Sequence, residues 1–237
     1  MKTIIRKLLN FFHIDLTRNL KYDRLTKSII KKGINISSNC IDVGCHKGEM
    51  LELMIKLAPQ GKHIAFEPIP TLFEHLRSEF SEKAVIYPYA LSDKNGESTF
   101  QHVKNAQAYS GINKRKYDIT NPDIEEIRVE IRVLDQLLAK DFHVDFIKID
   151  VEGGEYHVLK GAKDILQRCK PLIVFEFGLG ASDYYGVTPE DIFSLLTECQ
   201  LNISTLKAYV KNKPALNLNS FKECYSSGKE YYFVAHS

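Results

Sequence analysis

Tryptophan is absent from this 237-residue chain, and cysteine occurs only five times, in no Cys-x-x-Cys pair. The odd number and the spacing exclude a disulfide framework and give no zinc knuckle, so we expect a reducing, cytoplasmic setting. No apolar run approaches the ~20 residues that a membrane span needs. The chain start also lacks the small-residue cleavage site of a signal peptide. These absences favour a globular protein, and the length suits one large α/β domain.

Two common nucleotide-binding glycine patterns are also missing. From Gly44, the positions of a dinucleotide fingerprint hold Gly44, His46 and Glu49, and no Gly-Lys-Ser/Thr phosphate loop follows. What is present is Asp42-x-Gly44-x-x-x-Gly48, between a short apolar strand and an apolar-periodic helix. Glycine lets the backbone approach a ligand, and an aspartate accepts hydrogen bonds from an ammonium or hydroxyl group. The pattern predicts a site for the amino-acid part of S-adenosylmethionine, with a ligand-free tight turn as the alternative.

The next two predicted strands extend this site. The strand 62–66 ends at Glu67-Pro68, and an acidic residue at this place reaches the ribose hydroxyls of an adenosine. The third strand, 84–89, is expected at a sheet edge because Pro88 cannot donate to a neighbouring strand. The loop 90–93 after it is expected to hold the adenine ring. The predicted cofactor-binding residues are Asp42, Gly44, His46, Gly48, Glu67, Pro68, Ala90, Leu91, Ser92 and Asp150.

A turn signal and one alternating segment predict an added β-hairpin. Asn95-Gly96 leads into a strand over 97–103, and the strictly alternating segment 127–133 is expected to pair with it. Residues 104–126 between them lack periodicity, and a loop of this length is usually functional or disordered. Its polar side chains are interpreted either as substrate contacts or as a solvated surface: Tyr109, Ser110, Asn113, Lys114 and Arg115.

A second strand with charged side chains is predicted over 144–150. Alternation places Phe146, Lys148 and Asp150 on one face of this strand. A lysine inside an apolar strand is unusual unless it is paired or used chemically. A further strand, 173–178, carries Glu176 toward the same rim. The chain end is predicted to add two antiparallel strands, near 203–210 and 230–235.

The net charge of +2 is unevenly distributed. Residues 1–36 hold nine lysines and arginines against two aspartates, and the apolar residues of segment 3–16 have helical spacing. A second helical pattern runs to about Lys32, where Gly33 is a plausible stop. We therefore expect a basic helical arm over 1–36 before a domain over 37–237. The arm contacts a membrane surface or an acidic partner, or it packs its apolar stripe on the core.

Taken together, five segments resemble the FkbM family of S-adenosylmethionine-dependent methyltransferases over roughly residues 38–178. The strongest is Ile-Lys-Ile-Asp-Val-Glu-Gly, and one departure is the turn Gly44-Cys-His-Lys-Gly48, where the family commonly has Gly-Ala-Asn-x-Gly. The resemblance implies a Rossmann-like class I methyltransferase with strand order 3-2-1-4-5-7-6 and the last strand antiparallel. It also implies O-methylation, often of a sugar or polyketide hydroxyl. The segments are 41–48, 66–68, 90–93, 133–138 and 147–161.

Methyl transfer from a sulfonium mainly needs positioning and a group that takes the hydroxyl proton. The predicted catalytic residues are Lys148, Asp150 and Glu152, with Lys148 or Glu152 as proton acceptor and Asp150 holding the cofactor ammonium or orienting the acceptor. The alternative for Lys148 is an ion pair with Asp150 or Glu176. Tyr109, Ser110 and Glu176 are the predicted substrate-binding residues.

Three other interpretations fit parts of the sequence. Asp150, Glu152 and Glu176 offer the oxygen ligands of a Mg²⁺ or Ca²⁺ site, but no further clear ligand accompanies them, so we expect no metal. A non-catalytic scaffold that docks an acidic partner or membrane through the basic arm is the alternative to an enzyme. Nucleic-acid modification is disfavoured because the basic residues are confined to the arm. The expected partner is a small-molecule or glycan acceptor.

Overall fold

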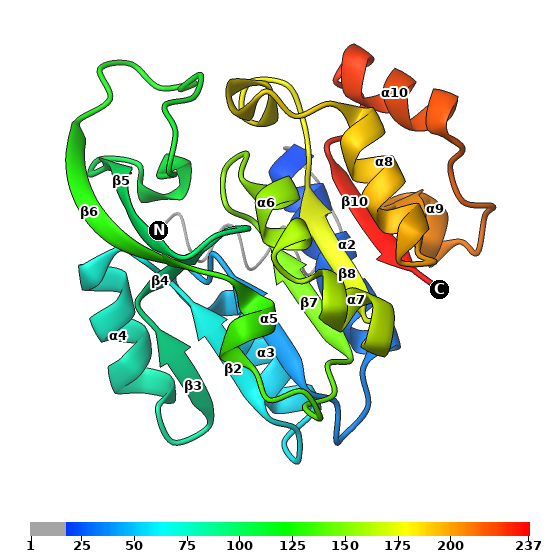
Figure 1. Ribbon diagram of the computed structural model, residues 1–237, viewed down its shortest axis with the longest axis horizontal. Coiled ribbons are helices and arrows are strands. Elements are labelled where there is room, and N and C mark those ends of the chain that lie inside the picture. Colours follow the sequence, from blue (N-terminus) through cyan, green and yellow to red (C-terminus); the bar gives the residue numbers. More distant parts are fainter. Residues whose placement is uncertain (1–17) are drawn as a thin grey trace.

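The computed structural model describes residues 18–237, and its centre is a seven-stranded sheet. The strand order is β3-β2-β1-β7-β8-β10-β9, and β10 is antiparallel to both of its neighbours. Counted along the sheet's own strands, this is the predicted order 3-2-1-4-5-7-6, so the predicted fold class is confirmed (Figure 1). The strands are β1 (Cys40–Val43), β2 (His63–Phe66), β3 (Ala84–Tyr87), β7 (Phe146–Ile149), β8 (Leu172–Glu176), β9 (Asn202–Thr205) and β10 (Tyr232–His236).

Helices cover both faces of this sheet because its central strands are apolar on both sides. On one face, Ile147 and Ile173 pack with the buried side chains of one set of helices. On the other, Phe146 and Val174 pack with a second set. The first set includes α6 (Glu155–Lys160), α7 (Lys163–Cys169), α8 (Pro189–Glu198) and α10 (Leu218–Ser227); the second includes α2 (Arg18–Gly33), α3 (Glu49–Leu57) and α9 (Leu206–Val210).

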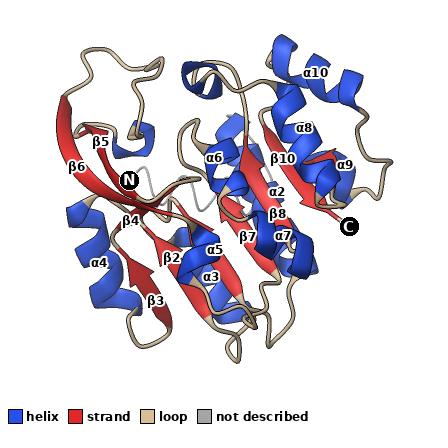
Figure 2. Ribbon diagram, viewed as in Figure 1, coloured by secondary structure: helices blue, strands red, loops and turns tan. Residues whose placement is uncertain are grey.

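A separate three-stranded sheet crosses one end of the main sheet (Figure 2). Its strands β5 (Gly96–Val103) and β6 (Ile124–Arg132) form the predicted antiparallel hairpin, in a register that pairs Phe100 with Ile127. The third strand, β4 (Tyr89–Leu91), pairs in parallel with β6. The prediction of a loop over 90–93 is therefore wrong for Ala90 and Leu91, which belong to β4. Pro88 ends β3 at the sheet edge as predicted.

The C-terminal expectation is confirmed for the pairing and wrong for one boundary. β9 and β10 pair antiparallel, but the strand expected to reach residue 210 stops at Thr205. The Thr205 side chain accepts a hydrogen bond from the Ala208 backbone N–H, which caps the start of α9. The remaining helices are α4 (Pro70–Phe80) and α5 (Leu134–Leu137), with 3₁₀ turns η1 (Gln107–Tyr109) and η2 (Ser182–Tyr185).

α2 is the described part of the predicted basic arm. Its residues Tyr22, Leu25, Ile29 and Ile30 are buried against the sheet, so this helix packs its apolar stripe on the core. The amphipathic pattern over 3–16 lies outside the described residues. Within residues 18–237, no helix combines the length and apolarity required to cross a membrane.

Candidate active site

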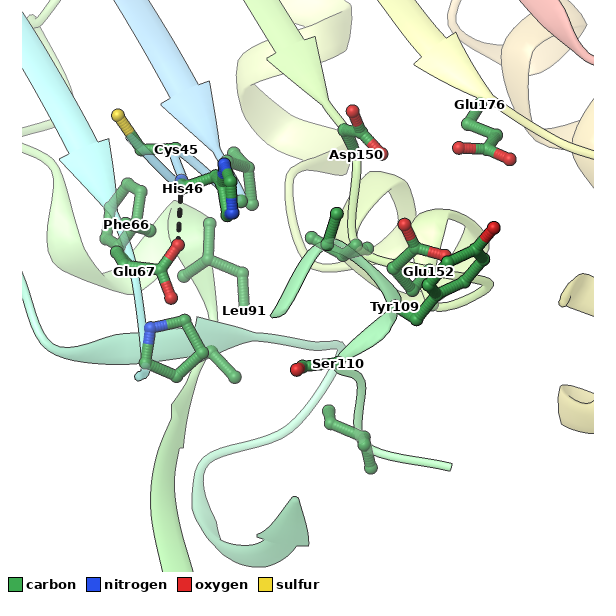
Figure 3. A pocket seen from close by; sticks show the side chains of 18 of the residues that line it. Cys45, His46, Phe66, Glu67, Leu91, Tyr109, Ser110, Asp150, Glu152 and Glu176 are labelled. Carbon is green, nitrogen blue, oxygen red and sulfur yellow. Dashed lines mark hydrogen bonds between the residues drawn. The ribbon is translucent and has the colours of Figure 1, made fainter. Parts of the chain in front are cut away.

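The carboxyl ends of β1, β2, β7 and β8 open into one cavity of about 1280 Å³. Figure 3 shows its labelled side chains in two groups. His46 and Glu67 lie on one side, and Asp150, Glu152 and Glu176 lie on the other. This volume exceeds the 300–1,000 Å³ typical of a site for one small molecule, so it has room for two ligands.

The turn between β1 and α3 brings bare backbone to the cavity. Gly44 and Gly48 have φ values of 74° and 81°, in the left-handed region that favours glycine. A Cβ atom on Gly44 would lie 1.9 Å from the Asp150 carbonyl oxygen, so this turn packs directly against the β7 loop. His46 is also left-handed, at φ 52°, and its backbone N–H donates to Glu67 Oε2 over 2.8 Å. The sequence-predicted turn is therefore a glycine-dependent cradle.

Glu67 connects this turn to the end of β2. Its carboxylate is 4% exposed and accepts backbone hydrogen bonds from His46 and, through Oε1, from Ile69 over 2.9 Å. Burial raises the pKa of Glu67 to about 7. Pro68 also lines the cavity, so the two successive strand ends meet at one place.

The predicted adenine segment lines the same cavity from another element. Ala90 and Leu91 in β4 and Ser92 after it are all buried at its wall. The Ser92 backbone N–H donates to the Arg132 carbonyl over 2.9 Å, which fixes this segment on β6. A Cβ atom on Gly161 would lie 2.2 Å from the Ser92 carbonyl oxygen, so α6 packs tightly behind it.

Lys148 is held between two carboxylates at the centre of the sheet. Its Nζ lies 3.5 Å from Asp42 Oδ1 and 3.3 Å from Asp150 Oδ2. Burial alone would lower the pKa of Lys148, but the charges of Asp150 and Asp42 outweigh it and raise that pKa above its usual value. The predicted Lys148–Asp150 ion pair is therefore present. A proton acceptor must be neutral, so this pairing favours Glu152 over Lys148 as the predicted proton acceptor.

Asp42 shares this internal arrangement. Its side chain is 1% exposed, and its charge is matched by Lys148. The geometry thus gives Asp42 an internal partner where we expected a ligand ammonium.

The loop after β7 is held by a residue that we did not predict as functional. Glu155 Oε1 accepts the backbone N–H groups of Val151 and Gly153 over 3.0 and 3.1 Å. It is fully buried, and burial raises its pKa to about 7. The pattern in the sequence that could have indicated it is Glu152-Gly-Gly-Glu155, in which a second glutamate follows the first by three residues.

The backbone of Glu152 lies in the left-handed region, at φ 59°. Its side chain forms an ion pair with Arg115 from the 104–126 loop. This loop also anchors to η2, because the Asn113 backbone N–H donates to the Tyr185 hydroxyl over 3.0 Å. Arg115 thus brings this loop to the cavity wall, and its contact with a substrate stays a prediction. Ser110 lines the cavity, but its hydroxyl accepts the Val103 backbone N–H over 2.9 Å, so it also anchors β5.

Three carboxylates meet at this side of the cavity. Asp150, Glu152 and Glu176 each place an oxygen within 4.8 Å of the others. Burial and the neighbouring Asp150 raise the pKa of Glu176 well above its usual value. Burial would also raise the pKa of Asp150, but Lys148 and the Tyr232 hydroxyl lower it overall. The pKa of Asp150 therefore lies below that of Glu176.

Comparison with known proteins agrees with this arrangement. The Methyltransferase FkbM domain family matches residues 42–202. The chain belongs to this family. The predicted family is therefore confirmed, and with it a methyltransferase that uses S-adenosylmethionine. Family membership covers β1 through the start of β9, whereas α2 and β10 lie outside the matched residues.

Two curated relatives are methyltransferases by name, one an O-methyltransferase and the other a methyltransferase of a hexuronic acid. The 2-O-methyltransferase NoeI of Sinorhizobium fredii is 25% identical over 168 residues, which are 65% of this chain and 68% of NoeI. The hexuronic acid methyltransferase AglP of Haloferax volcanii is 31% identical over 147 residues, 60% of this chain and 56% of AglP. The crystal structure of Methyltransferase FkbM from Methylobacillus flagellatus has a TM-score of 0.53 at 15% identity, covering 86% of this chain and 44% of that one. The chain thus spans only part of these proteins, and the structural likeness concerns the fold.

The residues present fit S-adenosylmethionine. The turn lines the cavity through Gly44, Cys45 and His46, and it packs this closely against the β7 loop because Gly44 has no Cβ atom. Glu67 lies at the strand end where a ribose is bound in βαβ units. Both features open on the cavity that also holds the three carboxylates.

Proposed function

We propose that the protein transfers the methyl group of S-adenosylmethionine to a hydroxyl group of a sugar or a related small molecule. The observation that carries this proposal is the single cavity with a glycine cradle on one side and Asp150, Glu152 and Glu176 on the other. The names of NoeI and AglP support a sugar hydroxyl as the acceptor. A sugar offers several hydroxyls, and adjacent carboxylates are suited to accept hydrogen bonds from them.

On the cofactor side, the backbone of the turn and the end of β2 provide the binding groups. S-Adenosylmethionine supplies a methyl group on a sulfonium, ready for in-line attack by an oxygen. Glu67 holds the ribose, and the segment after β3 surrounds the adenine. The residues assigned to cofactor binding are Gly44, His46, Gly48, Glu67, Pro68, Ala90, Leu91 and Ser92, all but Gly48 at the cavity wall.

On the acceptor side, Asp150 orients the acceptor hydroxyl. It is ionised and accepts a hydrogen bond from that hydroxyl, which keeps the oxygen lone pair free for the methyl group. Asp150 or Glu152 takes the proton as the new bond forms, since the charges of Asp150 and Asp42 raise the pKa of Lys148. Glu176 and Tyr109 contact the remaining part of the acceptor.

The test combines a binding and a transfer measurement. Calorimetric titration with S-adenosylmethionine should show micromolar binding, and NAD should show none. Transfer of labelled methyl groups is then measured over neutral sugars, uronic acids, amino sugars and non-sugar polyols. Methylation of one sugar class, lost in Asp150→Asn, supports the proposal. Cofactor binding with no sugar methylated, but with a non-sugar hydroxyl compound methylated, overturns the acceptor assignment.

A divalent-metal role has its own measurement. Asp150, Glu152 and Glu176 come together as that hypothesis requires. We propose transfer without a metal, so activity should persist in EDTA. Activity lost in EDTA and restored by Mg²⁺ or Ca²⁺ contradicts this.

We also propose that the protein is cytoplasmic and that residues 1–36 contact an anionic partner or the inner membrane surface. The support is the excess of nine basic over two acidic residues in this segment. Sedimentation with vesicles of anionic lipid, and not with neutral ones, is the expected result. Equal sedimentation with both, or with neither, contradicts a charge-driven membrane contact.

A further inference from the structure

Tyr232 contacts the carboxylate that we assign to the acceptor. Its hydroxyl donates to Asp150 Oδ2 over 2.9 Å. The Lys148 ammonium lies 3.3 Å from the same oxygen. Two donors on Oδ2 hold the carboxylate in one orientation and leave Oδ1 as the oxygen for a further hydrogen bond.

Tyr232 comes from a strand outside the residues matched by the family. It is the first residue of β10, where it pairs across the antiparallel ladder with Glu176. The adjacent strands β7, β8 and β10 therefore bring Asp150, Glu176 and Tyr232 to one rim. Only the last of these lies beyond residue 202.

α2 supports Tyr232 from behind. The rings of Tyr22 and Tyr232 stack with centroids 5.0 Å apart and planes inclined by 29°. Tyr22 is 2% exposed, and its hydroxyl donates to Glu230 Oε2 over 2.6 Å. One turn earlier, Arg18 donates to the Gly228 carbonyl over 2.7 Å. These contacts fix the start of β10 on α2.

We propose that Tyr232 is a positioning residue for Asp150 in methyl transfer, and that α2 holds Tyr232 in place through Tyr22. This inference rests on the proposed function. In-line transfer is sensitive to the direction of the attacking oxygen, and an aspartate whose Oδ2 is held by two donors presents Oδ1 in one direction. α2 and β10 thus add to the family domain a support for its acceptor side.

The kinetic test uses two neighbouring tyrosines. Tyr232→Phe removes the hydroxyl on Asp150, and Tyr231→Phe removes a hydroxyl that donates to Asn19 Oδ1 over 2.7 Å. The cost of a lost hydrogen bond to a charged group predicts that kcat falls about tenfold in Tyr232→Phe, with the KM for S-adenosylmethionine nearly unchanged. Tyr231→Phe should retain kcat within about twofold. Equal kcat in both variants overturns the inference.

A second measurement does not depend on activity. The Asp150 carboxyl carbon is titrated by ¹³C NMR, with its signal assigned by its absence in Asp150→Asn. Removing the Tyr232 hydroxyl should raise the pKa of Asp150 because a donor to the charged form is lost. Lys148 and Glu176 are retained in both tyrosine variants, so Tyr231→Phe should leave this pKa unchanged. No difference between Tyr232→Phe and the native protein overturns the inference. An inactive native protein with the expected NMR shift contradicts the proposed function alone.

The contribution of α2 is tested through the stack. Tyr22→Leu keeps an apolar side chain in the core but removes the aromatic contact with Tyr232. Tyr22→Phe keeps the ring and removes only the hydrogen bond to Glu230. We expect kcat to fall in Tyr22→Leu and to be largely kept in Tyr22→Phe, with both variants folded at the assay temperature. Native kcat in a folded Tyr22→Leu overturns the role of α2.

Discussion

The two sides of the cavity differ in how far apart their residues lie in the chain. The cofactor side is built mainly from two consecutive strand ends. The turn that contains Gly44 is joined to Glu67 by the hydrogen bond from the His46 backbone N–H. The acceptor side collects residues from the 104–126 loop, β7, β8 and β10. A local pattern therefore suffices for the first side, whereas the second exists only once distant segments have packed.

The largest effect is expected where the two sides touch. Gly44→Ala would place a Cβ atom 1.9 Å from the Asp150 carbonyl oxygen, and a backbone atom cannot move aside. We expect a loss of at least about 4 kcal/mol in the free energy of unfolding and loss of S-adenosylmethionine binding. Urea unfolding and calorimetry measure these.

Gly186→Ala is the matched control for this change. Gly186 is also left-handed, at φ 67°, but a Cβ atom there meets nothing within 4 Å. We expect only the conformational cost of about 1–2 kcal/mol. Equal losses in the two variants contradict the close approach of the two sides.

Lys148→Met should have the next largest effect. It leaves Asp42 and Asp150 without the ammonium that lies between them. Breaking a buried ion pair on one side costs about 3–5 kcal/mol, which urea unfolding measures. Lys163→Met removes an exposed pair with Glu198 and should leave the unfolding midpoint unchanged. A small change in Lys148→Met contradicts the pairing.

The two sides should separate in the kinetics of Asp150→Asn and Glu67→Gln. Loss of the acceptor carboxylate should lower kcat about 100-fold or more, while the affinity for S-adenosylmethionine changes little. Glu67→Gln should weaken that affinity about tenfold and affect kcat less at saturation. Calorimetry and steady-state kinetics measure both. A large affinity loss in Asp150→Asn would assign Asp150 to the cofactor instead.

The smallest effect concerns pH. Burial raises the pKa of Glu67 to about 7 from an ordinary 4.5, so between these values the folded protein binds more protons than the unfolded chain. This side chain therefore lowers the free energy of unfolding as the pH rises through that window. Glu67→Gln does not titrate, so it should gain about 1–3 kcal/mol relative to the native protein between pH 5 and pH 8. Urea unfolding at both pH values gives this difference. A constant difference contradicts the shifted pKa.

Most of the fold was predictable because its signals are local. Short apolar strands, each followed directly by Gly44, Glu67 or Asp150, alternate with helical segments along the chain, and such alternation produces a parallel sheet. The error at residues 206–210 arose because the side-chain cap at Thr205 overrides a strand-like apolar pattern. Ala90 and Leu91 were assigned to a loop because the strand that they pair with lies about forty residues later.

The sequence alone determined the family and the glycine cradle, since both depend on short motifs, and the sheet order followed from the family resemblance. Tertiary structure decided the surroundings of Lys148, because two carboxylates from different strands raise its pKa against the effect of burial. It also decided the support of Asp150 by Tyr232, which lies 82 residues further along the chain. Packing of strands and helices brings such residues within hydrogen-bond distance, and no local pattern in the sequence records that contact.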